Sequence, residues 1–92
     1  MDDRPVVWDY ANRKHIEEDH PERGLSGQQV DEVLADPDRY EIPTDRPEHF
    51  LVIGASVRGR LLVVVWVDDP RGRYPIHARQ ADRREARRYY ER

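Results

Sequence analysis

One segment of the chain, Leu61–Val67, constrains the fold more than any other because all of its residues are apolar. A strand presents alternate side chains to opposite faces of its sheet, so a strand without polar positions needs cover on both faces. The run is also much too short to cross a membrane as a helix. It therefore predicts a central strand with neighbours on both sides and helices over one face.

The segments around this strand alternate between helical and extended patterns. Pro and Gly residues separate them, and residues with short side-chain oxygens stand where helices are expected to begin. We expect one α+β domain over residues 1–92, with two N-terminal helices packed on an antiparallel β-meander and a C-terminal helix. The expected helices are Tyr10–His20 after Asp9, Gly27–Ala35 after Ser26, and a terminal helix after Asp82; the expected strands are Pro5–Trp8, Arg39–Ile42, Phe50–Gly54, Leu61–Val67 and Arg73–Arg79.

Composition indicates a small soluble domain without cysteine chemistry. Hydrophobic residues make up 37% and charged residues 38% of the sequence, so the core must be thin. The chain has no cysteine, which excludes disulfides, thiolate metal sites and thiol nucleophiles. The acidic start Met1–Arg4 lacks the apolar stretch of a signal peptide. We expect a cytoplasmic protein with no membrane partner, no metal and no cofactor.

Charge is divided unevenly along the chain, although the net charge is only −3. Residues 1–56 hold 6 basic and 14 acidic residues, a balance of −8, whereas residues 57–92 hold 10 arginines and 5 acidic residues, a balance of +5. The second half would attract a polyanion, and the first half would attract a basic partner. The same division would also arise if charged faces only kept a small domain soluble.

Alternation along the last expected strand predicts two faces of different character. The apolar set is Tyr74, Ile76 and Ala78, and the set on the opposite face is Arg73, His77 and Arg79. An imidazole near its unperturbed pKa of about 6.5 exchanges a proton at cellular pH, and guanidinium groups attract phosphate. Ribonuclease chemistry needs such a base, an acid and fixed cations around the phosphorane. A solvent-facing strand with ordinary polar residues explains the pattern equally well.

The first expected helix holds another histidine. Asn12, His15 and Asp19 are spaced i, i+3, i+7 and share one helix face. His20 follows His15 by about 140° around the helix, so the two do not form a His-x3-His metal pair. A half-buried His15 bonded to Asn12 or Asp19 is the simpler interpretation. A metalloenzyme that uses His15, His20 and His77 ranks last among our hypotheses.

Arginines of the C-terminal third form a candidate basic surface. Two i, i+4 pairs lie on the terminal helix beside two tyrosines, a combination that suits phosphates and base stacking. Two more arginines flank the hairpin glycine before the central strand. The candidate nucleic-acid contacts are Arg58, Arg60, Arg73, Arg83, Arg84, Arg87 and Arg88. The alternative is that a tyrosine seals the helix to the core while the arginines face solvent.

Four motifs, in this order, resemble those of a known family. They are Trp8-Asp9 followed by Asn12; a histidine-containing helix before Leu25-Ser26 and Val30–Leu34; Phe50–Gly54 followed by Arg60–Val65; and Ile76–Arg79 followed by Arg83-Arg84-Glu85 and Tyr89. In these motifs the chain resembles the BrnT family of type II toxins, small bacterial ribonucleases with a RelE-like fold. The resemblance covers nearly the whole chain.

The resemblance implies metal-independent RNA cleavage that halts translation. It also implies neutralisation by a separate antitoxin, expected to bind DNA, in a complex that represses its own operon. Arg79 matches the family's arginine at the end of the last strand, and Arg83-Arg84-Glu85 matches its terminal charged motif. The leading hypothesis is therefore an endoribonuclease in which Arg79 stabilises the phosphorane, His77 or His15 moves protons, and Arg60 with the terminal-helix arginines holds RNA.

A catalytically inactive binding module or co-repressor component is the alternative hypothesis. Its support is the acidic first half and three differences from the family pattern. Asp19-His20-Pro21 stands where the family usually has Lys-His-Gly, Ala55 stands where many members have arginine, and His77 stands where a small residue is common. Such a module would bind RNA with a steep salt dependence without cutting it.

Overall fold

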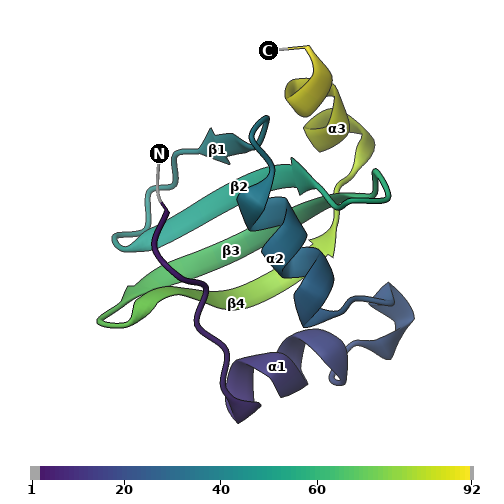
Figure 1. Ribbon diagram of the computed structural model, residues 1–92. Coiled ribbons are helices and arrows are strands. Elements are labelled where there is room, and N and C mark those ends of the chain that lie inside the picture. Colours follow the sequence, from purple (N-terminus) through teal and green to yellow (C-terminus); the bar gives the residue numbers. More distant parts are fainter. Residues whose placement is uncertain (1–2, 92) are drawn as a thin grey trace.

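Residues 3–91 are described by a computed structural model, which has the expected α+β arrangement (Figure 1). The sheet is antiparallel in the order β1-β2-β3-β4, so every strand pairs with its neighbours in the sequence. The described part of the chain contains no helix long and apolar enough to cross a membrane. The elements are α1 (Tyr10–Glu17), the 3-10 helix η1 (Pro21–Arg23), α2 (Gly27–Ala35), β1 (Tyr40–Ile42), β2 (His49–Ala55), β3 (Leu61–Asp69), β4 (Gly72–Gln80) and α3 (Arg83–Tyr90).

β3 is an inner strand, as its apolar sequence predicts. Leu62, Val64 and Trp66 belong to the core cluster that includes the buried residues of α2, and Figure 1 shows α2 lying across this face of the sheet. Val63 points to the other face and is completely buried as well. Burial on both faces explains why this strand tolerates no polar side chain over its first seven residues.

α3 lies against the face of the sheet opposite α2. One cross-strand row on this face consists of Tyr40, Ile53, Val63 and Arg79. The two ends of the row are bound by α3, because Glu85 pairs with Arg79 and the Arg88 guanidinium lies 5.5 Å from the Tyr40 ring centroid. The helix therefore covers the row, and Ile53 and Val63 beneath it are fully buried.

A β-bulge in β4 corrects the expected division of its side chains. Val65 pairs with His77 and Trp66 with Pro75, so Ile76 has no partner across the strands. An extra residue reverses the faces on one side of the bulge relative to simple alternation. His77 and Arg79 share a face as expected. The expectation is wrong for Arg73, which lies on the core side, and for Tyr74, which lies on the side of His77.

The N-terminal segment and α1 are shorter than expected. The predicted strand Pro5–Trp8 is reduced to one isolated bridge between Val6 and Arg73, with hydrogen bonds on both sides of Arg73. α1 ends at Glu17 instead of His20. Pro21 accounts for this early end, because the residue before a proline is disfavoured in the helical conformation, and His20 is non-helical at φ −130°, ψ 66°.

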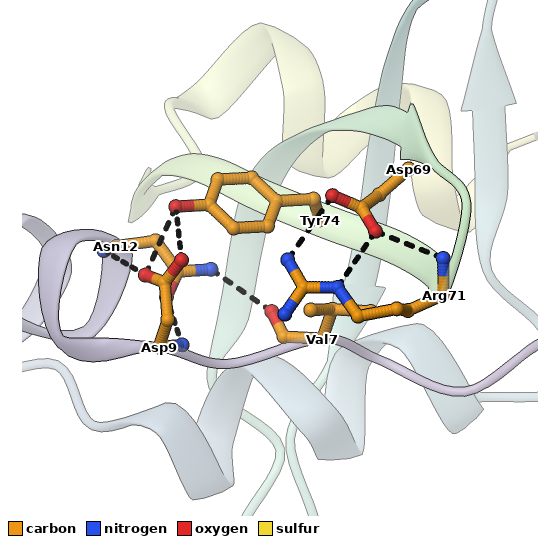
Figure 2. A network of polar contacts seen from close by, with 6 residues as sticks. All are labelled: Val7, Asp9, Asn12, Asp69, Arg71 and Tyr74. Carbon is orange, nitrogen blue, oxygen red and sulfur yellow. Dashed lines mark hydrogen bonds and ion pairs between the residues drawn. The ribbon is translucent and has the colours of Figure 1, made fainter.

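All three predicted N-caps are confirmed, and each forms a reciprocal capping box. Ser26 and Asp82 each accept a backbone hydrogen bond from the third residue of their helices. Asp9 does the same for α1 and also accepts a hydrogen bond from the Tyr74 hydroxyl at 3.0 Å, as Figure 2 shows. Asn12 is buried and donates to the carbonyls of Val7 and Pro75. These bonds fix α1 against β4 and so determine where His15 lies.

Candidate active site

The candidate site is centred on His77, which β4 presents on the face opposite α2. Its ring forms no hydrogen bond with any other residue in the range 3–91, so its nitrogens stay available to a ligand. Burial lowers the pKa of His77 below its ordinary value, and the positive charges of Arg23 and Arg79, followed by His15 and His20, lower it further. The imidazole is therefore neutral at cellular pH, which is the form that accepts a proton.

Arg79 is held rigidly by α3. Its Nη1 and Nη2 donate to the two carboxylate oxygens of Glu85, both at 2.7 Å, and Nη1 also lies 3.3 Å from the Gln80 carbonyl. This pairing raises the pKa of Arg79 and lowers the pKa of Glu85. Glu85 is oriented by the helix N-terminus, because it also accepts the Asp82 backbone N–H. The Nε–H and one Nη2–H of Arg79 bind no other residue in the described range 3–91 and would be available to a phosphate.

The end of α1 supplies the histidines on the other side of His77. His15 is half-buried and its Nδ1 lies 3.3 Å from Asp19 Oδ2, as the simpler interpretation predicted, although Asp19 lies beyond the end of α1 and not on its face. Asp19 also accepts a hydrogen bond from Lys14 Nζ at 2.6 Å, and this bond is the main reason that the pKa of Asp19 is lowered. The His15 and His20 rings meet edge to face, with centroids 5.6 Å apart. Asp19 thus contacts both Lys14 and His15.

No metal site is found among these side chains. Within the described residues, no group of three or more His, Cys, Asp or Glu side chains is arranged to hold a metal ion. His20 has Glu22 as its neighbour at 3.4 Å, and His15 has Asp19. The metalloenzyme hypothesis therefore gains no support from the geometry.

Arg60 does not extend into the site as a free cation. Its Nη2 donates to the Arg23 carbonyl at 2.6 Å and its Nη1 to the Gly24 carbonyl at 2.9 Å, with the Gln80 side chain 3.4 Å away. Arg23 in turn donates from Nη1 to the Ala78 carbonyl at 3.2 Å, beside His77. Arg23 is thus the site residue that the sequence analysis missed. It lies in a turn, where no periodicity indicates the direction of a side chain.

Arg73 lies outside this site. It is 7% exposed and on the core side, where its guanidinium donates to the carbonyls of Arg4 at 2.8 and 3.0 Å and of Leu34 at 3.4 Å. A buried cation surrounded by carbonyl acceptors ties chain segments together and does not face solvent. We therefore leave Arg73 out of the proposed nucleic-acid contacts.

The remaining candidate arginines are exposed and lie at two places, the β2–β3 hairpin and α3. Arg58 lines, together with Arg60, Ser26, Gln28 and Glu32, a surface pocket of about 440 Å³ beside the β2–β3 hairpin. On α3, the arginines point to solvent while Tyr89 is half-buried and donates to Asp36 Oδ2 at 2.6 Å. The α3 arginines are Arg83, Arg84, Arg87 and Arg88, of which Arg87 lies 3.8 Å from Glu91.

Comparison with known proteins gives one family match. A family model described as the ribonuclease toxin, BrnT, of type II toxin–antitoxin systems matches residues 8–85. The matched range begins at Trp8, just before the α1 cap, and ends at Glu85, so it includes every residue of the His77 cluster. No curated protein gives a significant match to the chain.

Proposed function

Because the chain belongs to the BrnT family of ribonuclease toxins of type II toxin–antitoxin systems, we propose that it cleaves RNA at the cluster around His77 and Arg79. Family membership implies an RNA target and an antitoxin partner. The observation that carries our choice of site is His77 itself. Its imidazole is half-buried, is kept neutral by burial and by neighbouring cations, and has no hydrogen-bond partner within residues 3–91.

In the proposed reaction, neutral His77 removes the proton from a 2′-hydroxyl, whose oxygen then attacks the adjacent phosphorus. The bond from phosphorus to the 5′-oxygen breaks, which leaves a 2′,3′-cyclic phosphate on one fragment and a 5′-hydroxyl on the other. Arg79 and Arg23 stabilise the extra negative charge of the phosphorane. Such preorganised charge commonly contributes about 3–4 kcal/mol to transition-state stabilisation.

We assign the general acid, which protonates the departing 5′-oxygen, to His15. Its support is geometric, because the Asp19 carboxylate lies 3.3 Å from His15 Nδ1 and would orient the ring. The exposed arginines of α3 and Arg58 are proposed to hold flanking phosphates. This route needs no metal ion, and cleavage of messenger RNA in the cytoplasm would halt translation. The antitoxin is proposed to be a DNA-binding protein.

A catalytically inactive binding module remains the second candidate, and the pairing of its arginines favours it. Glu85 engages Arg79 in two short hydrogen bonds, and backbone carbonyls engage Arg60. A phosphate would compete with a well-placed carboxylate for the same guanidinium. In this alternative the protein binds a partner or RNA through its surface charges and does not cut RNA.

Cleavage of labelled RNA by the purified full chain in the presence of EDTA tests the proposal. We expect cyclic-phosphate products, and a loss of about 10²–10⁴-fold in rate for His77→Ala and for Arg79→Gln. His49→Ala is the matched control, because His49 lies on the same sheet face but its ring bonds only to the Pro47 carbonyl among described residues. Its rate should equal that of the unmodified chain.

Induction of the same variants in a bacterial host extends the test to translation. The unmodified chain should arrest growth and produce new RNA fragments, and His77→Ala should do neither while remaining folded. Soluble expression with normal growth and intact RNA would favour the binding module. Cleavage that EDTA abolishes would contradict the metal-independent route.

A further inference from the structure

The backbone of the short turn Pro21–Gly24 accepts hydrogen bonds from Arg60, a residue far away in the sequence. Arg60 begins the approach to β3 from the β2–β3 hairpin, yet both ends of its guanidinium donate to the carbonyls of Arg23 and Gly24. Gly24 adopts a left-handed backbone, φ +59°, which directs its carbonyl and that of Arg23 to the same side chain. The planar fork of an arginine holds two neighbouring carbonyls in one fixed geometry, with one Nη group on each.

The Pro21–Gly24 turn places the side chain of Arg23 at the candidate site. Arg23 donates to the carbonyl of Ala78, the residue that follows His77 in β4. After burial, the charge of Arg23 is the largest influence on the pKa of His77. The backbone of the turn is thus fixed by Arg60 on one side, and its Arg23 side chain is fixed by β4 on the other.

We infer that Arg60 is a positioning residue, which clamps the Pro21–Gly24 turn so that the Arg23 guanidinium stays beside His77 and acts there as the second phosphate-binding cation. The role assigned to Arg23 at a phosphate rests on the proposed function. The clamp itself does not, because it predicts the electrostatic environment of His77 whether or not the protein cleaves RNA. This inference corrects the expectation that Arg60 holds RNA directly.

The charged groups around His77 come from three elements. Arg23 lies on η1, His20 caps η1, His15 lies on α1, and Arg79 follows on β4 itself. If the clamp is released, the turn moves and Arg23 no longer repels the imidazolium form of His77. The pKa of His77 should then rise toward its ordinary value, while the contributions of Arg79 and the two histidines remain.

NMR titration of His77 in the full-length chain measures the clamp without any activity assay. We expect Arg60→Gln and Arg23→Gln each to raise the pKa of His77. The double variant should show no larger rise than Arg23→Gln alone, because Arg60 acts through Arg23. Arg58→Gln removes the same charge from the same exposed hairpin without touching the turn, and it should leave the pKa of His77 unchanged.

The Arg60→Lys variant tests the geometry of the clamp separately from the charge of residue 60. It also provides a conservative substitution in case Arg60→Gln does not fold. Lysine keeps the positive charge but has no planar fork for two carbonyls. The pKa of His77 should therefore rise in Arg60→Lys as it does in Arg60→Gln. An unchanged pKa in folded Arg60→Lys, or additive rises in the Arg60→Gln/Arg23→Gln double variant, would overturn the inference.

The rate of RNA cleavage provides a second readout. Loss of the clamp should reduce kcat by on the order of 10-fold to 100-fold through misplacement of Arg23, and the acidic limb of the rate profile should move to higher pH. If the unmodified chain does not cleave RNA while the NMR shifts appear as expected, the proposed function fails and the clamp stands. If cleavage occurs without the NMR shifts, the clamp fails and the proposed function stands.

Discussion

The two ends of β4 carry arginines that look interchangeable in the sequence and serve opposite purposes. Arg73, before the bulge, is buried on the core side and binds the carbonyls of Arg4 and Leu34. Arg79, after the bulge, lies on the other face, pairs with Glu85 and remains partly exposed. A single unpaired residue, Ile76, separates the two settings. Alternation along a strand therefore predicts faces only between bulges.

The difference lies in what satisfies each guanidinium. Arg73 donates to carbonyls of the N-terminal segment and of the end of α2, so its side chain holds three parts of the chain together. Among the described residues, Arg79 has one carboxylate partner, and its Nε–H and one Nη2–H donate to none of them. The first arrangement contributes to stability, and the second leaves donors for a ligand.

Deletion of a strand residue should give the largest effect, and its size should depend on the bulge. Removing Ala78 uses up the bulge, but it moves His77 into the buried Ala78 position and Ile76 into the position of His77, and we expect a loss of about 3–4 kcal/mol in unfolding free energy because an imidazole enters the core. Removing Ile76 only converts the bulge into a regular ladder, and it should cost about 2 kcal/mol or less. Urea unfolding measures both. Equal losses for the two deletions would contradict the observed register.

Replacing each arginine by methionine should separate stability from activity. Arg73→Met leaves buried carbonyls without a donor, and we expect a loss of about 2–3 kcal/mol in unfolding free energy. Arg79→Met breaks a partly exposed pair and should cost about 1 kcal/mol or less, while RNA cleavage falls by about 10²-fold or more. Urea unfolding and the RNA assay are measured on the same preparations. A stable Arg73→Met variant would argue against its structural role.

Stability should depend weakly on pH because of His77. Its pKa is lower in the folded chain than in the unfolded chain, so the unfolded state binds more protons as the pH falls below about 6.5. The folded state is therefore favoured above this pH and loses stability as the pH falls toward the folded pKa. Between pH 7.5 and pH 5.5, the urea midpoint of His77→Gln should fall less than the urea midpoint of the unmodified chain. An unchanged pH dependence in this variant would contradict the lowered pKa.

The carboxylates bound in the fold affect stability in a separate, more acidic range. Hydrogen bonds and neighbouring positive charges hold the pKa values of Asp9, Asp19 and Glu85 below their ordinary range, although burial opposes this shift; the largest causes are the Asn12 backbone, Lys14 and Arg79 respectively. Their stabilising contribution is present above the unfolded pKa values near 4 and is lost as the pH falls through the lower folded values. The comparison between pH 7.5 and pH 5.5 therefore reports mainly on histidines.

Local features of the fold could be predicted from the sequence with good accuracy. The three N-caps, the helix Gly27–Ala35 and the central position of β3 are all confirmed, because capping and burial on both faces depend on residues close together in the chain. The bulge also left a signal that the sequence analysis did not use. Pro75 lacks a backbone donor, and a proline within a strand indicates an edge strand or a bulge.

The candidate site could be predicted only in part. His77, Arg79 and the His15–Asp19 pair followed from spacing within one strand or one helix. Arg23 and its clamp by Arg60 did not, since the two residues are 37 positions apart and meet through backbone carbonyls that have no sequence signature. The burial of Arg73 likewise depends on chain segments that are distant in the sequence.

The sequence by itself determined most of the elements that this protein forms and which family it belongs to, because caps, periodicity and motif order are local properties of the chain. Only the tertiary structure decided which face each side chain of β4 takes, and which arginines hold the fold together or remain available to a phosphate. The physical reason is that strand register, and the partner of a buried donor, depend on packing between segments. Neighbouring residues alone do not specify that packing.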